Sequence, residues 1–312
     1  MMYALIDKDR RNRERIRPFI GGEEVNNDPL HAHRRYVIQF DDLTKREAQE
    51  GWPDLLALVE QYVRPQRLLD NREQRRENWW QHGERQTGLY NSIHGMRRVI
   101  GLSIVSPQFA ITTLPVGIVY AHSLAIFAFD KFQSFAALQS RVHESWTRFF
   151  SSSMKDDLRY APSDCFRTFP FPANFEIDPV LEAAGEAYHA FRAQLMIDRN
   201  VGLTKTYNRF HARGANAADI ATLRTLHHAM DVAVLRAYGW DDLADAAAPE
   251  FIEQDTDEGR TPKTRLDWSA SFKDKVLARL LSLNAQRAAE ERAAGLVVVD
   301  EGEDNEEDST DD

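Results

Sequence analysis

The stretch SDCFRTFPFP, Ser163 to Pro172, ends in an alternation of phenylalanine and proline. Proline restricts φ and has no amide proton, so neither a helix interior nor a central strand accepts this pattern. Short apolar runs separated by proline and glycine precede the stretch, and helical patterns follow it. It therefore marks a boundary between a mixed α/β region and an all-helical region, and the sequence predicts an α+β fold.

Upstream of this boundary, helical and strand patterns alternate. Residues 34–40 alternate like a strand, and residues 44–80 begin with a Thr-x-x-Glu capping box and continue as helix with one break at Gly51-Trp52-Pro53. Residues 97–129 contain β-rich runs and are expected to form the sheet. Residues 134–154 return to a helical period, with one apolar stripe expected to pack on that sheet: Phe135, Leu138, Val142, Trp146 and Phe149.

Downstream, three segments have helical patterns, over 178–200, 215–240 and 269–295. Residues 1–30 combine a Gly-Gly pair and an Asn-Asn-Asp-Pro turn with no helical period, and we interpret them as a junction. The sequence thus predicts four parts, which are the junction (1–30), a mixed α/β domain (31–172), a helical C-terminal domain (173–295) and a disordered acidic tail (296–312).

Cysteine content and hydropathy narrow the class of protein. Cys165 is the only cysteine of the chain, which excludes a disulfide framework and a cysteine zinc cluster and favours a cytoplasmic location. Next to Phe166, it is expected to be a small buried apolar residue. No signal peptide and no bilayer-length apolar run is present, so no membrane partner is expected.

Charge is distributed unevenly along the chain. The net charge is −10, but nine of the last thirteen residues are acidic, so the rest of the chain is nearly neutral. The tail is either a solvating terminus or an internal mimic of DNA that competes for a basic surface. The segment from position 64 to position 98 contains eight arginines and four acidic residues. Seven of them are expected to form a phosphate-binding rim at the entrance to the sheet: Arg64, Arg67, Arg72, Arg75, Arg76, Arg97 and Arg98.

No complete catalytic motif is present. The sequence has no glycine-rich nucleotide loop, no Asn-Pro-Pro-aromatic tetrapeptide, no P-loop and no His-Glu-x-x-His metal motif. A nuclease pattern fails because Tyr62 stands where a lysine is required after Pro53-Asp54 and Glu60. We therefore expect no catalytic residue and no metal site in this chain, and a binding module is favoured over an autonomous enzyme.

Three stretches resemble one protein family. Residues 135–172, FAALQSRVHESWTRFFSSSMKDDLRYAPSDCFRTFPFP, resemble the end of the target-recognition domain of type IIL (MmeI-like) and type IIG adenine-specific DNA methyltransferases, including those of anti-phage defence islands. IRPFIGGEEVN resembles the passage into that domain, and GLTKTYNRFHA with LRTLHHAMDVAVLRAYGW resembles the helical region after it. The resemblance reaches to about Gly295.

The resemblance implies a restriction-modification function. Such proteins methylate adenine N6 with S-adenosylmethionine, held by a methyltransferase domain that precedes the GGEEVN passage and carries an Asn-Pro-Pro-Tyr loop. This chain begins just before that passage, so we expect a C-terminal fragment, a split-gene product or a specificity subunit. The cofactor would then lie on a missing or partner methyltransferase domain, and residues 31–172 would be the domain that recognises double-stranded DNA.

The resemblance also implies where bases are read. In the family, residue pairs two apart before Arg-Tyr contact base edges; here these are Lys155 and Asp157. Arg159 beside them either reads a base as well or holds the loop or a phosphate. A lysine can donate to guanine and an aspartate can accept from cytosine, so the pair could read one G·C base pair. The Phe-Pro stretch is expected to anchor this reading segment in the core through Phe166, Phe169, Pro170, Phe171 and Pro172.

Two other functions stay open at this point. One is an autonomous nuclease with an unrecognised site. The other is an interaction or assembly remnant that no longer binds DNA and acts through its acidic tail. Binding to DNA that weakens steeply with added salt separates the DNA-binding module from the remnant.

Overall fold

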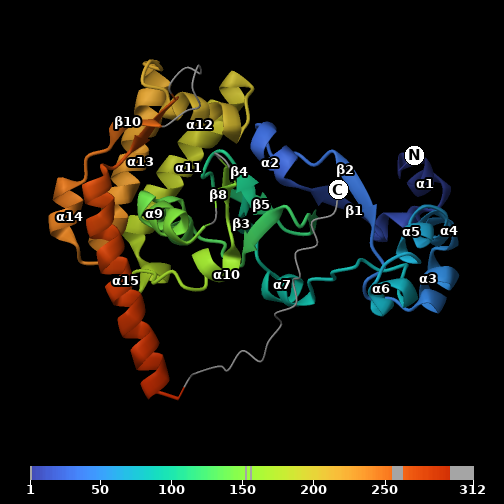
Figure 1. The fold of residues 1–312 in the computed structure, drawn as a ribbon. Coiled ribbons are helices and arrows are strands. Elements are labelled where there is room, and N and C mark those ends of the chain that lie inside the picture. Colours follow the sequence, from blue (N-terminus) through green and yellow to red (C-terminus); the bar gives the residue numbers. More distant parts are fainter. Residues whose placement is uncertain (1, 152, 155–156, 255–262, 296–312) are drawn as a thin grey trace.

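The computed structural model describes residues 2–151, 153–154, 157–254 and 263–295 of the 312-residue chain. The predicted acidic tail lies outside the described residues. Within them, many helices surround small sheets, and the fold is α+β (Figure 1). Across the described ranges, no helix combines the length and the hydropathy needed to cross a membrane.

An N-terminal lobe forms around a small core of its own. Ile16, Phe40, Leu55 and Trp79 are buried in it, and the lobe lies at the right in Figure 1. The predicted helix over 44–80 is divided into short helices, with Pro53 in the first turn of one of them, where an amide proton is not needed. The elements of the lobe are α1 (Met2–Lys8), η1 (Arg10–Glu14), α3 (Lys45–Gly51), α4 (Pro53–Tyr62), α5 (Arg64–Arg67) and α6 (Glu73–Glu77).

Three small sheets form the middle of the molecule, and strands appear where the sequence predicts them over 34–40 and 97–129. In the first sheet, β1 (Ile16–Ile20) pairs antiparallel with β2 (Arg35–Ile38) and parallel with β6 (Val119–Tyr120). The second has the order β5 (Thr112–Pro115), β3 (Arg98–Ser103), β7 (Leu124–Phe127). The third has the order β4 (Val105–Ser106), β9 (Asp157–Arg159), β8 (Ser153–Met154). Helix α7 (Thr87–Ser92) precedes β3.

Residues 1–30 contain more regular structure than the sequence indicates. Besides α1 and β1 they form α2 (Gly22–Asn27), so the expectation of no helix there was wrong. Ile20 and Val25 are fully buried in the main core. A Cβ atom on Gly22 would lie 2.6 Å from Oγ of Ser103, so glycine permits the close approach of α2 to β3.

The predicted helix over 134–154 is two helices, α8 (Phe132–Gln139) and α9 (Arg141–Phe150). Ser140 interrupts them with an extended backbone, and its hydroxyl accepts a hydrogen bond from the His143 amide as the N-cap of α9. Four residues of the predicted stripe are fully buried. Phe149, next to the last residue of α9, is the exception at 55% exposed.

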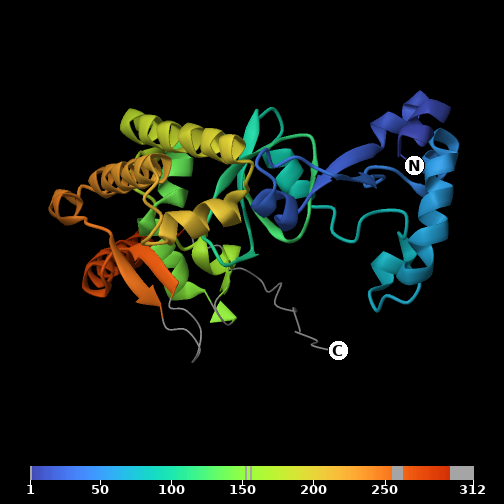
Figure 2. The same cartoon turned by 90° about the horizontal axis from the view of Figure 1, so that it is seen from above.

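The C-terminal region is helical with one exception. Its helices are α11 (Pro179–Arg199), α12 (Leu203–His211), α13 (Ala218–Ala237), α14 (Asp241–Ala246) and α15 (Ala270–Ala293), and α10 (Pro162–Cys165) and η2 (Phe175–Ile177) precede them. The exception, which the helical patterns do not predict, is the antiparallel pair of β10 (Glu250–Gln254) and β11 (Lys263–Asp267). Viewed from above, these helices lie together at the end opposite the N-terminal lobe (Figure 2).

One hydrophobic core joins the middle sheets to the C-terminal helices. It runs from Ile20 and the central strands through Phe135 and Trp146 to Leu280 in α15. Helix α11 crosses α8 so closely that a Cβ atom on Gly185 would lie 2.2 Å from the Phe132 carbonyl oxygen. The helices therefore support the sheets directly.

Candidate nucleic-acid interface

The predicted reading segment forms part of the sheet β4-β9-β8. Val105 of β4 pairs with Arg159 of β9, and the next pair is Ser106 with Leu158. Leu158 and Ser106 are buried, whereas Val105 and Arg159 are exposed. Because side chains alternate along a strand, this sheet turns one face to the core and the other outward.

Tyr160 anchors the end of β9. Its amide donates to the Ile104 carbonyl oxygen at 2.8 Å, and its hydroxyl lies 3.3 Å from Nε2 of His143. Both side chains are buried. Burial lowers the pKa of His143 to about 4 and raises the pKa of Tyr160 far above its usual value. The contact is therefore between two neutral groups near pH 7, and it ties β9 to α9.

Cys165 lies beside this anchor on α10. It is fully buried, with its sulfur 3.8 Å from the Ser151 hydroxyl and 3.9 Å from the Thr147 carbonyl oxygen. Burial raises the pKa of the thiol. Cys165 is thus a small buried residue, as expected from its apolar neighbours, and it is poorly placed for nucleophilic chemistry.

The Phe-Pro stretch packs as an aromatic cluster against the core side of the predicted reading segment. The centre of the Phe169 ring lies 4.6 Å from the centre of the His143 ring and 4.8 Å from that of Phe171. The ring centres of Phe166 and Phe127, which is in β7, are 4.8 Å apart. Phe169, Pro170 and Pro172 are buried, and Phe166 and Phe171 are half-buried. The cluster connects the sheet, α9 and the start of the helical region.

Of the three predicted base-reading residues, Arg159 alone is described in full. It is exposed on the outer face of β9. Lys155 lies outside the described residues, and for Asp157 the structure describes the backbone, which pairs with Met154 of β8.

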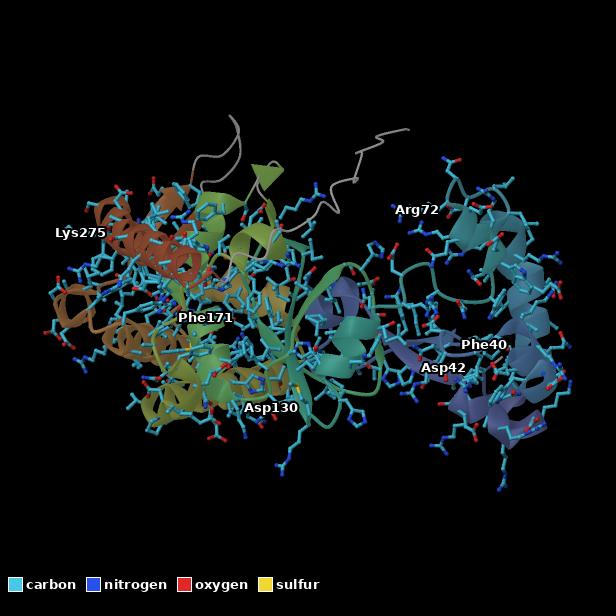
Figure 3. All side chains as sticks on the ribbon, turned by 90° about the horizontal axis from the view of Figure 1, so that it is seen from below. Phe40, Asp42, Arg72, Asp130, Phe171 and Lys275 are labelled. Carbon is cyan, nitrogen blue, oxygen red and sulfur yellow. The ribbon has the colours of Figure 1, made fainter. Side chains whose placement is uncertain are left out.

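The seven predicted phosphate-binding arginines do not lie together. Arg97 and Arg98 stand at the start of β3 in the middle of the molecule, and the other five are in the N-terminal lobe. Figure 3 shows Arg72 on that lobe, well separated from Asp130, whose carbonyl oxygen accepts a hydrogen bond from Arg98. The structure thus forms two basic groups in place of one rim.

The five arginines of the lobe have partners within it. Arg72 and Arg75 share Glu84, at 3.2 and 2.6 Å, and Arg67 and Arg75 approach Asp70 at 4.0 and 3.5 Å. Arg64 pairs with Glu60 at 2.6 Å, and Arg76 donates to two backbone carbonyl oxygens. These contacts reduce the positive potential that the lobe presents to a phosphate.

The two arginines of the middle group differ in their surroundings. Arg98 is half-buried: its Nε donates to the Asp130 carbonyl oxygen at 2.9 Å, and its guanidinium lies 4.1 Å from the centre of the Phe132 ring. Arg97 is exposed and forms no ion pair with any described residue. Arg98 therefore joins β3 to α8, and Arg97 faces solvent.

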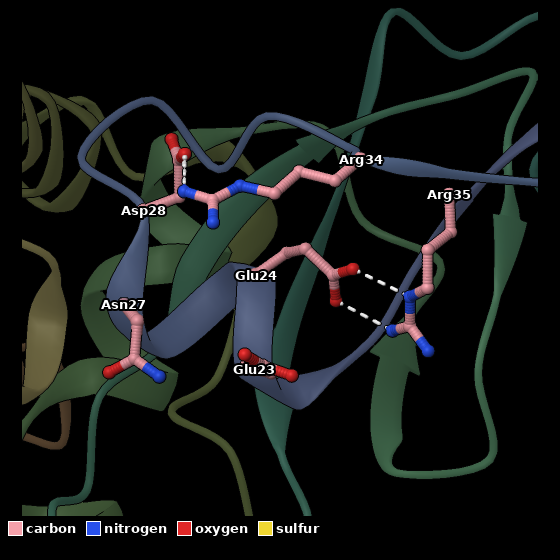
Figure 4. A pocket seen from close by; sticks show the side chains of 6 residues that line it. All are labelled: Glu23, Glu24, Asn27, Asp28, Arg34 and Arg35. Atoms are coloured by element: carbon pink, nitrogen blue, oxygen red, sulfur yellow. Dashed lines mark hydrogen bonds and ion pairs between the residues drawn. The ribbon is translucent and has the colours of Figure 1, made fainter.

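A shallow pocket lies beside α2, with a volume of about 260 Å³ (Figure 4). Glu24 binds Arg35 through two contacts of 2.8 Å, and Asp28 pairs with Arg34 at 3.1 Å. Hydrogen bonding from Arg35 lowers the pKa of Glu24. The cations of this pocket are already neutralised, so it does not suit a phosphate.

Two features of the site have no local signal in the sequence. Val105 lies 54 positions before Arg159, and only the pairing of β4 with β9 brings the two together. The second is a buried polar group in which Arg141 of α9 binds Asp231 and His227 of α13. Long-range pairs of this kind depend on the fold, and no spacing rule indicates them.

Within the part of the chain that the structure describes, no group of three or more histidine, cysteine or acidic residues is arranged to hold a metal ion. His227, the first of the two adjacent histidines in α13, instead lies 3.2 Å from Asp231. The site thus consists of an exposed strand face on a rigid, internally hydrogen-bonded support.

These features define an α+β protein with a short surface strand, β9, whose end is hydrogen-bonded to the core. The family model described as "MmeI, target recognition domain" matches residues 2–173. The chain belongs to this family.

A solved structure gives the same fold over a wider range. The type IIL restriction-modification enzyme MmeI in complex with DNA matches with a TM-score of 0.59 and 17% sequence identity, covering 92% of this chain. That match covers 33% of the MmeI chain, so this chain spans about a third of the length of MmeI. At this identity the likeness establishes the fold. No curated protein matches.

Proposed function

We propose that this chain is the DNA-sequence recognition module of a type IIL restriction-modification system. The observation that carries the proposal is membership of the MmeI target recognition domain family, together with the exposed, rigidly anchored face of β9. MmeI itself was solved in complex with DNA. The major groove admits a β-ribbon, and a small sheet with one buried face fits that mode of reading.

The proposed base-reading residues are Lys155, Asp157 and Arg159. Arg159 is the best supported of them, because its exposed side chain stands on a strand that Tyr160 fixes to the core. Arginine donates two hydrogen bonds to O6 and N7 of guanine, so we assign Arg159 a guanine. The role of Lys155 and Asp157 in reading a G·C pair rests on the sequence.

The phosphate contacts are proposed for the arginines whose side chains reach solvent. Arg97 is exposed, and the side chain of Arg72 is 60% exposed. Arg64, Arg67, Arg72, Arg75 and Arg76 would have to exchange their present partners for phosphates. Arg98 would support the interface from within β3.

The methylation chemistry is proposed to lie on another domain or subunit. This chain would select the site, and a methyltransferase would transfer the methyl group of S-adenosylmethionine to adenine N6 there. Neither a catalytic residue nor a cofactor is assigned to this chain. A role in cytoplasmic anti-phage defence follows from the same proposal.

The test is selection of bound duplexes from a random pool by the purified 312-residue chain, at two salt concentrations, followed by sequencing. The expected result is an enriched motif, with affinity that falls as salt rises because phosphate contacts release counterions. Arg159→Ala should remove the preference for guanine at one position and keep the rest of the motif. Absence of binding would refute the proposal and favour an interaction protein.

A further inference from the structure

The exposed face of β4 lies directly beside Arg159. Val105 and Arg159 are opposite each other in the antiparallel pair of β4 and β9. The Tyr160 amide donates to the Ile104 carbonyl oxygen at 2.8 Å, which makes the neighbouring pair a hydrogen-bonded one. The Val105–Arg159 pair therefore falls at a non-hydrogen-bonded position, where opposite side chains approach most closely.

Val105 is an exposed apolar residue on the outer face of β4. Its side chain is 54% exposed, whereas Ser106, next to it in the same short strand, is 6% exposed. The polar residue thus occupies the buried side of β4 and the apolar residue the outer side. On the same outward face as Arg159, the Val105 side chain offers an apolar group that can contact an apolar group of a ligand.

In the major groove, the apolar group that a base presents is the C5-methyl of thymine. Opposite side chains on one sheet face have Cβ atoms about 5 Å apart, and successive bases of a strand rise by about 3.4 Å. Two such side chains can therefore reach neighbouring base pairs. We infer that Val105 is a specificity-determining residue that contacts the methyl group of a thymine in the base pair next to the guanine read by Arg159. This inference rests on the proposed function.

The probe is the duplex selected by the wild-type chain, compared with the same duplex in which deoxyuridine replaces that thymine. Deoxyuridine lacks the methyl group and keeps every hydrogen-bonding group, so only the apolar contact changes. Wild type should bind the deoxyuridine duplex about fourfold more weakly, the effect of leaving one methyl group unburied. Val105→Ala should lose this discrimination, and Val105→Ile should keep it.

Val180→Ala is the matched control, because Val180 is also an exposed valine, 62% exposed, on α11. It should leave both affinities unchanged. Since Val105 is half in solvent, Val105→Ala is expected to fold, and an unchanged melting temperature verifies this.

The possible outcomes separate the inference from the proposed function. If the wild-type chain does not bind DNA, both the proposed function and the inference about Val105 are wrong. The inference alone is wrong if Arg159→Ala removes a guanine from the motif but the neighbouring position is not thymine. It is also wrong if Val105→Ala discriminates between the thymine and deoxyuridine duplexes as the wild type does. A thymine at that position with discrimination lost in Val105→Ala supports it.

Discussion

Arg141 and Asp231 form a buried ion pair that joins α9 to α13, with Nη1 2.5 Å from the carboxylate and side-chain exposures of 2% and 0%. The Arg141 amide also donates to the same carboxylate at 2.8 Å. His227 and the Leu266 carbonyl oxygen complete the set of partners. Because α9 carries His143, which contacts Tyr160 at the end of β9, this pair connects the helical region to the support of β9.

The first prediction concerns this pair. Asp231→Ala leaves the Arg141 guanidinium buried without its counter-charge, and it should lower the free energy of unfolding by about 3–5 kcal/mol. Denaturant unfolding followed by circular dichroism measures this. Asp245→Ala is the control, because it removes an exposed partner of Arg236 and should cost at most about 1 kcal/mol. Equal costs for the two variants would contradict the assignment.

The second prediction concerns pH. Burial lowers the pKa of His143 from 6.5 to about 4. At a pH between these two values, the unfolded chain therefore binds a proton at His143 that the folded chain does not. Stability should therefore fall as the pH decreases through this window, by up to about 1.4 kcal/mol per unit for this residue. Burial also lowers the pKa of His31 to about 4 and of His189 to about 3, which adds in the same direction.

Thermal melting between pH 4 and 7 measures this dependence. His143→Gln should flatten the curve within the window while lowering stability at pH 7, because it loses contacts with Tyr160 and Phe169. His94→Gln changes an exposed histidine and should leave the slope as it is. A slope that His143→Gln does not reduce would show that other groups cause it.

The third prediction concerns the contact of α11 with α8. In Gly185→Ala the new methyl group would meet the Phe132 carbonyl oxygen at 2.2 Å, so the helices must separate. The cost should be about 1–3 kcal/mol, as for other overpacked sites. Gly51→Ala is the control, since Gly51 ends α3 with no atom within 4 Å of the added Cβ. The control should be neutral or slightly stabilising, and a stable Gly185→Ala variant would contradict the close crossing.

The fourth prediction separates two adjacent arginines. Arg97→Ala should keep the melting temperature and reduce the salt dependence of DNA binding by about one counterion. Arg98→Ala should lower the melting temperature, because it removes the contacts with Asp130 and the Phe132 ring. Melting curves and a salt titration of both variants test this, and the reverse pattern would refute the assigned roles.

Local patterns account for the elements that the sequence predicted correctly. The strands over 34–40 and 97–129 and the three long C-terminal helices follow from alternation and helical periodicity. The family resemblance on 135–172 agrees with the family match over residues 2–173. The break at Ser140 was missed because a single N-cap residue decides it, and the short helix at 22–27 was missed as well.

The sequence by itself determined the α+β class and the family, since these depend on residue order and local propensity. Only the tertiary structure decided which arginines remain exposed, because Glu60, Asp70 and Glu84 approach them in the folded lobe. The same holds for Val105 beside Arg159 and for Arg141 on Asp231. Such pairs join residues far apart in the chain, and packing around a common core brings them together.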